Sequence, residues 1–167
     1  LDGPTFISSE GWDWVPGIRD RNIGIWQDVL LSFRNDISIK DPQIITDLPL
    51  PDTLSAKVSM KLDLINNSNK PQLANLQLQL ENINISKQVQ LKANERKQVI
   101  ISSDEFPQLD IKNPRLWWPN GYGNPELYSM DISVLQDNQL SDKKTIRFGV
   151  REFDYELSIN DSDKHIR

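Results

Sequence analysis

The sequence predicts an all-β fold, an immunoglobulin-like antiparallel β-sandwich of about seven strands. Apolar and polar side chains alternate along most of the chain, and the alternating runs recur at intervals of roughly ten residues. No segment has its apolar residues at the spacing of an amphipathic helix. Seven candidate strands fall between about Ile37 and Arg151, a number typical of immunoglobulin-like domains. The Cys…Trp…Cys pattern of antibody domains is absent.

The first predicted strand starts near Ile37. The second, SAKVSMKLDL, has every second residue apolar, as expected for a strand with one buried face; these residues are Ala56, Val58, Met60, Leu62 and Leu64. The segment NNSNKP then predicts a turn. LANLQLQLEN and ISKQVQLKAN alternate in the same way, and the short run KQVIIS follows the polar turn ANER.

The last two predicted strands are ELYSMDISVLQ and KTIRFGV, joined by a turn in QDNQLSD. The alternation slips by one residue near Arg151 and Glu152, so a bulge or an element boundary is expected there. Residues 1–24 are rich in Gly, Pro, Trp and Asp and show almost no periodicity. IWQDVLLSF after them predicts one strand without a nearby partner. Residues 152–167 are expected to begin another strand and then to lose regular structure in INDSDKHIR.

The composition excludes several classes of function. The formal net charge is −5, so no basic face is available for nucleic acid, and neutral partners such as sugars fit this balance better than polyanions. The chain has no cysteine and a single histidine, His165. These counts exclude thiol catalysis, Ser-His-Asp catalysis and Cys- or His-rich metal sites, and we expect no metal and no cofactor. No apolar run is long enough to span a membrane.

Three of the five tryptophans lie in EGWDWVPGIRDRNIGIW. A carboxylate between two indoles suits a sugar, because the rings pack on C–H faces while Asp13 accepts hydrogen bonds from hydroxyl groups. Packing of Trp12, Trp14 and Trp26 under an irregular loop is the more ordinary explanation. The chain opens at LDGPTF without an initiator Met, so we expect a piece of a longer polypeptide.

The other two tryptophans are adjacent, in NPRLWWPNGYGNPELY, residues 113–128. If the chain is extended there, Trp117 and Trp118 point to opposite sides. One then enters the core and the other faces solvent or a neighbour. The prolines, glycines and asparagines around them favour a long packed loop that leads into the strand of Tyr128.

Other motifs carry less weight. Glu95 lies between two predicted strands and before Arg96 and Lys97, which indicates a solvated turn and not a catalytic pocket. Asn-X-Ser patterns at three positions are expected by chance in so Asn-rich a chain and matter only in a glycosylating host; they begin at Asn66, Asn84 and Asn160. No pair of carboxylates falls in a segment that predicts a catalytic cleft.

Taken together, the motifs resemble glycoside hydrolase family 2. GWDWVPGIRDRNIGIWQDVLL is similar to the end of that family's sugar-binding jelly-roll domain in the branch of β-mannosidases, exo-β-glucosaminidases and endo-β-mannosidases. NPRLWWPNGYGNPELY and IRFGVREF resemble the last third of the immunoglobulin-like second domain. Residues 37–112 between them match only as alternating strands.

The resemblance implies three parts. Residues 1–36 are a remnant of the jelly roll, residues 37–151 form the sandwich, and residues 152–167 lead into a (β/α)8 barrel. Both catalytic Glu residues of this retaining family belong to the barrel. We therefore expect no catalytic residue in this chain, and Asn94-Glu95 only superficially echoes the family's acid/base dipeptide. Exported parents are common among polysaccharide-degrading members, which favours the periplasm or the exterior.

The resemblance also implies that Asp13, with Trp12 and Trp14, contributes to the barrel's sugar subsite in the full-length protein. The expected partners are the jelly roll and barrel of the same polypeptide and the parent's oligosaccharide, with neither nucleic acid nor membrane. The expected function is non-catalytic: the sandwich positions the sugar-binding domain against the barrel. Two alternatives stay open, a free-standing carbohydrate-binding module with Trp platforms and a self-contained glycosidase.

Overall fold

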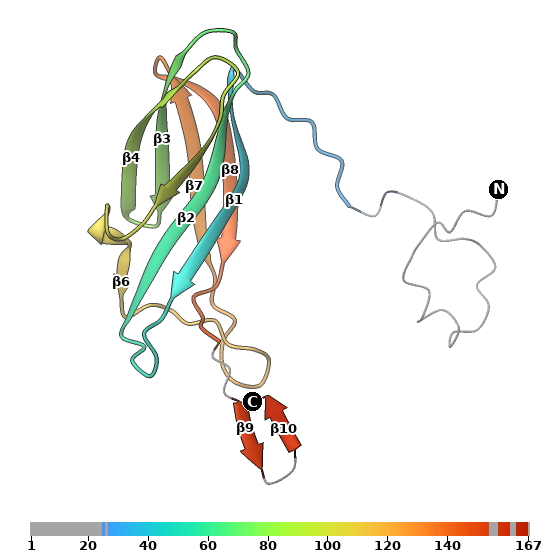
Figure 1. Cartoon of the computed structure of the whole chain (residues 1–167), viewed down its shortest axis with the longest axis vertical. Helices are drawn as coiled ribbons and strands as arrows, with labels where there is room; N and C mark the ends of the chain where they lie inside the picture. Colours follow the sequence, from blue (N-terminus) through green and yellow to red (C-terminus); the bar gives the residue numbers. More distant parts are fainter. Residues whose placement is uncertain (1–24, 26, 154–156, 161–162, 167) are drawn as a thin grey trace, which may run out of the picture. The chain divides into compact units, whose positions relative to one another are not determined.

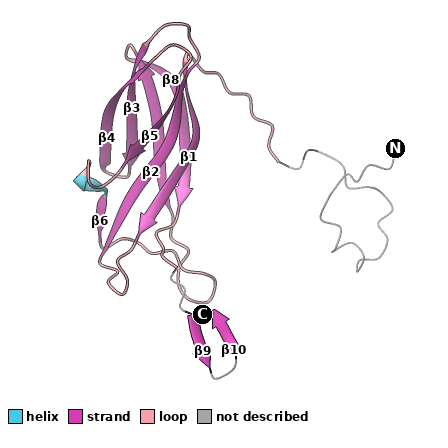
Figure 2. Cartoon of the chain, in the orientation of Figure 1, coloured by secondary structure: helices cyan, strands magenta, loops and turns pink. Residues whose placement is uncertain are grey.

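The computed structural model describes residues 25, 27–153, 157–160 and 163–166. The chain divides into one unit of residues 1–32 and a second of residues 33–167. Two antiparallel sheets in the second unit form a β-sandwich (Figures 1 and 2). The described residues contain no α-helix, only one short 3-10 turn, η2 (Pro107–Leu109). The predicted all-β, immunoglobulin-like fold is confirmed.

One sheet has the order β1-β2-β5, and the short strand β6 also pairs with β2. Its strands are β1 (Ile37–Asp47), β2 (Ser55–Asn66), β5 (Arg96–Ile101) and β6 (Asp110–Lys112). The other sheet has the order β4-β3-β7-β8. Its strands are β3 (Gln72–Leu80), β4 (Ile83–Leu91), β7 (Tyr128–Gln136) and β8 (Gln139–Phe148). β2 and β3 are consecutive but belong to different sheets, so the chain crosses the sandwich between Asn66 and Gln72.

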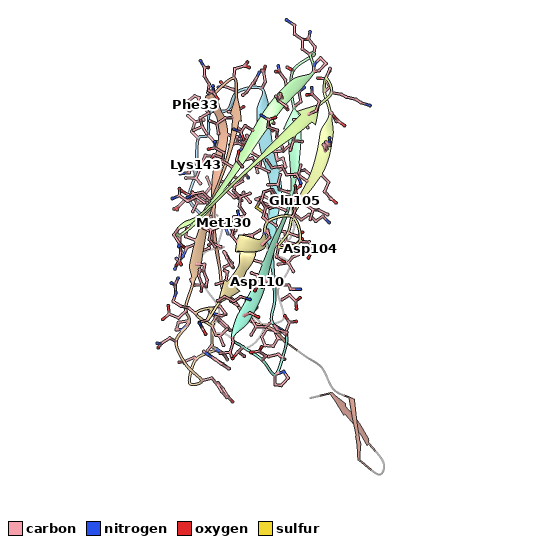
Figure 3. All side chains as sticks on the ribbon, turned by 90° about the vertical axis from the view of Figure 1, so that its left-hand side faces the viewer. Phe33, Asp104, Glu105, Asp110, Met130 and Lys143 are labelled. Atoms are coloured by element: carbon pink, nitrogen blue, oxygen red, sulfur yellow. The ribbon has the colours of Figure 1, made fainter. Side chains whose placement is uncertain are left out.

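The core lies between the two sheets, where side chains fill the space (Figure 3). The alternation of β2 predicts this arrangement, because successive side chains of a strand point to opposite faces. All five apolar residues that alternate in β2 are at most 1% exposed, and those of β7 are at most 4% exposed. The core therefore follows directly from the period-two pattern.

A two-residue turn sets the register between β7 and β8. Gln136 pairs with Gln139 across the two-residue loop Asp137-Asn138, and both loop residues have positive φ, 50° and 61°. Positive φ at both central positions defines the type I′ turn, whose twist matches that of an antiparallel hairpin. Asp and Asn tolerate this conformation better than most residues, which explains the sequence DN at this turn.

The two sheets are joined along one edge by side chains of β8. Ser141 Oγ accepts a hydrogen bond from Ile37 N at 2.9 Å and donates one to Ile37 O at 2.7 Å. Asp142 Oδ2 accepts a hydrogen bond from Ile39 N at 2.8 Å and also lies 3.5 Å from Arg34 Nε. These buried polar side chains satisfy the edge of β1, which has no strand on that side.

Three sequence predictions were incomplete or wrong. The sandwich has eight strands in the described residues, because the three-residue β6 is too short to show alternation. The predicted strand IWQDVLLSF does not form: its described residues, 25 and 27–33, lie outside any strand. Val29, Leu30 and Leu31 there are about four-fifths exposed, whereas a half-buried strand would cover every second side chain. Near the C-terminus, residues 163–166 do not lose regular structure; β9 (Leu157–Asn160) and β10 (Asp163–Ile166) form an antiparallel hairpin.

Candidate functional site

The segment of residues 113–128 packs against residues 149–153 at the end of the sandwich where β8 finishes. Trp117 N donates a hydrogen bond to Val150 O at 2.9 Å, and Leu116 pairs with Val150 as an isolated parallel bridge. Trp118 N donates to Asn124 O at 3.1 Å. Backbone hydrogen bonds thus fix both tryptophans, although no regular strand contains them.

Each of these tryptophans lies against a glycine. A Cβ placed on Gly149 would lie 2.6 Å from Trp117 Cβ, and one placed on Gly123 would lie 2.7 Å from Trp118 Cδ1. Real Cβ contacts are not that short, so both positions need glycine for close approach. Trp117 is half-buried and lies outside the core cluster, whereas Trp118 is 45% exposed. The prediction that one of the pair faces outward is therefore correct, but its partner does not enter the core.

Arg151 fixes the point where the chain leaves the sandwich. Its guanidinium carbon lies 4.7 Å from the ring centroid of Trp117 and 4.7 Å from that of Phe153, so two cation–π contacts hold the same cation. Thr46 Oγ1 donates a hydrogen bond to Arg151 O at 3.2 Å. The end of β1 and a tryptophan from a distant loop together orient residues 150–153.

Tyr128, the first residue of β7, is held in place by contacts with Phe148 and Arg115. Its ring stacks on Phe148 with centroids 5.6 Å apart, and its hydroxyl oxygen accepts a hydrogen bond from Arg115 N at 2.8 Å. The Arg115 guanidinium lies 4.3 Å from the Tyr128 ring centroid and 2.6 Å from Glu81. The hydrogen bond to Glu81 raises the pKa of Arg115.

Next to Trp117 and Arg151 lies an open apolar hollow of about 300 Å³, which we call the Trp118 hollow. Three segments far apart in the sequence line it, namely Leu48, Leu50 and Thr53, residues 116–119 with Tyr122, and residues 150–153. Sequence reasoning singled out the tryptophans but missed Leu48, Leu50 and Arg151. The Leu-Pro-Leu-Pro run at residues 48–51 is the one signal that could have indicated an apolar loop.

A second, polar hollow of about 290 Å³ lies on the β4-β3-β7-β8 sheet, lined by residues that include Gln77, Gln79 and Asp131. Hydrogen bonds from Lys143 Nζ, and then from Thr145 Oγ1, lower the pKa of Asp131. The Trp118 hollow and this polar hollow contain one carboxylate each, Glu152 and Asp131. Hydrolysis by the two-carboxylate mechanism needs a pair.

The remaining sequence candidates have simple structural roles or lie outside the described residues. Glu95 lies in the turn between β4 and β5, as predicted, where Oε2 accepts a hydrogen bond from Lys92 N at 2.6 Å. Trp12, Asp13, Trp14 and Trp26 fall among the residues that the structure does not describe. Across the described part of the chain, acidic residues and histidine form no group of three that could hold a metal ion. That part also has no helix of the length and apolar character needed to cross a membrane.

Asn66, the first asparagine of the three Asn-X-Ser patterns, has a structural role. It is fully buried, and its Nδ2 donates hydrogen bonds to Lys70 O at 2.7 Å and Lys92 O at 2.8 Å. Its Oδ1 accepts from Ser68 N and Ser68 Oγ. The side-chain amide is therefore committed to the turn and is not accessible for glycosylation.

Comparison with known proteins places this arrangement in a family. The family model of glycosyl hydrolases family 2 matches residues 37–151. The chain belongs to glycosyl hydrolases family 2. The family 2 chain is 32% identical to an exo-β-D-glucosaminidase of Streptomyces avermitilis over 143 residues, which are 85% of this chain and 16% of that protein.

Two further proteins are similar to this chain. A β-mannosidase B of Aspergillus clavatus is 27% identical over 93% of the family 2 chain and 17% of its own length. The crystal structure of an exo-chitosanase from Amycolatopsis orientalis superposes with a TM-score of 0.70 at 26% identity, over 87% of this chain and 16% of that one. The family 2 chain thus corresponds to a small part of each of these glycosidases.

Proposed function

We propose that residues 37–151 are the non-catalytic immunoglobulin-like domain of a retaining β-glycosidase of the β-mannosidase or exo-β-glucosaminidase type. In this proposal residues 1–36 belong to the preceding sugar-binding domain and residues 152–167 lead into the catalytic barrel. The sandwich holds these two neighbours in position. The main support is that the family match covers residues 37–151, while the relatives are glycosidases about six times longer than the matched region.

The contents of the hollows agree with a supporting role. A retaining glycosidase places two carboxyl groups about 5 Å apart across the scissile bond, and each hollow described above contains one. Glu95, the residue of the Asn-Glu dipeptide, accepts a hydrogen bond from its own turn. In this proposal both catalytic carboxylates come from the barrel.

Hydrolysis of nitrophenyl β-glycosides tests the proposal. The full-length polypeptide and a chain ending at residue 167 are assayed with β-D-glucosaminide and β-D-mannoside substrates. We expect turnover of at least one substrate by the full-length polypeptide and none by the shorter chain. A full-length polypeptide inactive on β-glycosides, or a 167-residue chain with turnover, would contradict the proposal.

Sugar titration separates the alternative of a free-standing carbohydrate-binding module. Tryptophan fluorescence of the 167-residue chain is followed while chitosan or manno-oligosaccharides are added. A supporting domain predicts no saturable change, whereas a binding module predicts saturation at millimolar or lower concentration. Among the tryptophans that the structure describes, Trp118, at 45% exposure, is the one best placed to report such binding.

Asp13 gives a further test in the full-length polypeptide. If its carboxylate binds substrate hydroxyl groups, Asp13→Asn removes a charged acceptor. Hydrogen bonds to charged groups contribute about 1.5–3 kcal/mol, so kcat/KM should fall about tenfold or more. Steady-state kinetics on the nitrophenyl substrate measure this, and unchanged kcat/KM would reject the role of Asp13.

A further inference from the structure

Exposed aromatic and apolar side chains gather around the Trp118 hollow. Leu50, Trp118, Tyr122 and Phe153 are 49%, 45%, 79% and 59% exposed, and all four line it. Single exposed apolar residues are ordinary on protein surfaces, but a contiguous apolar patch with aromatic residues is typical of a surface that contacts another protein.

The two charged side chains that line the hollow both contact other residues of the sandwich. The Arg151 guanidinium lies between the rings of Trp117 and Phe153, and Glu152 Oε2 accepts a hydrogen bond from Leu48 N at 3.4 Å. Thr53, the Tyr122 hydroxyl and the indole N–H groups of Trp117 and Trp118 are the uncharged polar groups of the lining residues. Leu48, Leu50, Leu116 and Val150 complete a lining that is mostly apolar, which favours an apolar protein surface as the occupant.

We propose that the Trp118 hollow is the docking surface for the catalytic domain that follows the sandwich in the same polypeptide. The proposal rests on the function proposed above and names the surface through which the sandwich acts. Residues 150–153 line the hollow, so the chain continues to the next domain from the hollow itself. Only residues 154–156 separate Phe153 from β9.

The short connection strengthens the argument for this occupant. Three residues span about 10 Å when fully extended, so the following part of the polypeptide begins close to the hollow. Tethering over such a distance gives a high effective concentration. In the exo-β-D-glucosaminidase, the matched region is 16% of the protein. Most of such a protein therefore lies outside the sandwich and can supply the domain that docks.

Cysteine accessibility in the full-length polypeptide tests the docking surface. Tyr122→Cys and Leu50→Cys place a thiol in the hollow, and Leu73→Cys places one on β3 outside it. Leu73 is 50% exposed and Leu50 is 49% exposed, which makes them a matched pair; Tyr122 is more exposed than either. Each variant is reacted with a maleimide under native conditions, and its rate is corrected for the background of the unsubstituted polypeptide.

Docking predicts that Tyr122→Cys and Leu50→Cys react at least tenfold more slowly than Leu73→Cys. Equal rates would overturn the proposal, as would rapid labelling that is slowed only by added chito-oligosaccharide, which would indicate a sugar site. Hydrolytic activity measured on the same samples keeps the two proposals apart. Active enzyme with an unprotected hollow rejects the docking surface alone, whereas an inactive full-length polypeptide counts against the proposed function.

Discussion

The loops at the two ends of the sandwich differ in their contacts: hydrogen bonds dominate at one end and aromatic side chains at the other. At the end where β2 finishes, Asn66 makes four hydrogen bonds to backbone and side-chain atoms of the adjoining turns and is fully buried. At the end where β8 finishes, aromatic side chains surround the Trp118 hollow and remain partly exposed. Figure 1 shows the β2–β3 connection and the segment after β6 at opposite ends of the strands. The first end is closed by its own contacts, whereas the second leaves apolar surface exposed.

Removal of the buried Asn66 amide should lower the free energy of unfolding more than any other substitution proposed below. Asn66→Ala removes the four hydrogen bonds of a fully buried side chain. The carbonyl groups of Lys70 and Lys92 keep second donors, Ser68 Oγ and Glu95 N. A hydrogen bond contributes about 0.5–1.5 kcal/mol net, so for the loss of these bonds we expect the free energy of unfolding to fall by about 3 kcal/mol. Urea denaturation of the 167-residue chain measures it. Asn84→Ala, at an exposed position of β4, is the control and should change stability by less than about 0.5 kcal/mol. Equal effects would show that the Asn66 end is not specially stabilised.

Gly149→Ala tests how tightly Trp117 is packed at the end of the sandwich where β8 finishes. Gly149→Ala would bring a methyl group 2.6 Å from Trp117 Cβ, an atom attached to backbone that backbone hydrogen bonds hold in place. Overpacking of this kind costs about 1–3 kcal/mol, and we expect a loss of about 2 kcal/mol in urea denaturation. Gly123→Ala meets the more exposed Trp118 ring and should cost less. If Gly149→Ala were neutral, the Trp117 contact would be loose.

Gly121→Ala, at the same end of the sandwich, measures the cost of backbone strain without any cost of packing. It has φ +86°, and a Cβ there would meet no atom within 4 Å. Tyr122 N donates to Pro119 O at 3.0 Å, and glycine suits the third position of such a turn because φ is positive there. Gly121→Ala should therefore cost about 1 kcal/mol through conformation alone. A loss as large as that of Gly149→Ala would argue against this separation.

The smallest expected effect concerns Asp131, which lies on the sheet surface between the two ends. Hydrogen bonds from Lys143 and Thr145 lower its pKa below the ordinary value of 3.8. The folded pKa is lower than the unfolded one, so the contribution to stability is present above the unfolded pKa and is lost as pH falls through the folded pKa. Asp131→Asn should reduce stability slightly at pH 7, and the difference from the unsubstituted chain should shrink in acid below about pH 4. Denaturation curves at pH 7 and pH 2.5 check this, and a constant difference would reject it.

The strands were predictable and the loops were not. Alternation at Tyr128, Met130 and Ile132 predicts the buried face of β7, and all three are at most 4% exposed. β6 escaped prediction because three residues are too few to show a period. IWQDVLLSF was wrongly predicted because an apolar run indicates a strand only where a neighbouring strand accepts its hydrogen bonds.

The candidate site was only partly predictable for a related reason. The sequence indicates that Trp117 and Trp118 lie in a turn-rich segment, but the partners of these rings are Gly149, Gly123 and Arg151, two of which come from a later part of the chain. Leu48 and Leu50 reach the same hollow from the loop after β1. No local pattern encodes these contacts, because they depend on how three separate loops fold against one another.

By itself, the sequence determined the all-β class, the inner faces of the sheets and the family, because alternation and short motifs are local properties of the chain. The tertiary structure alone decided that Asn66 is a buried hydrogen-bonding centre and not an accessible asparagine. It also decided that residues 48–53, 116–122 and 150–153 form one apolar hollow. Both outcomes depend on contacts between segments distant in sequence, where backbone hydrogen bonds and packing space set the environment of each side chain.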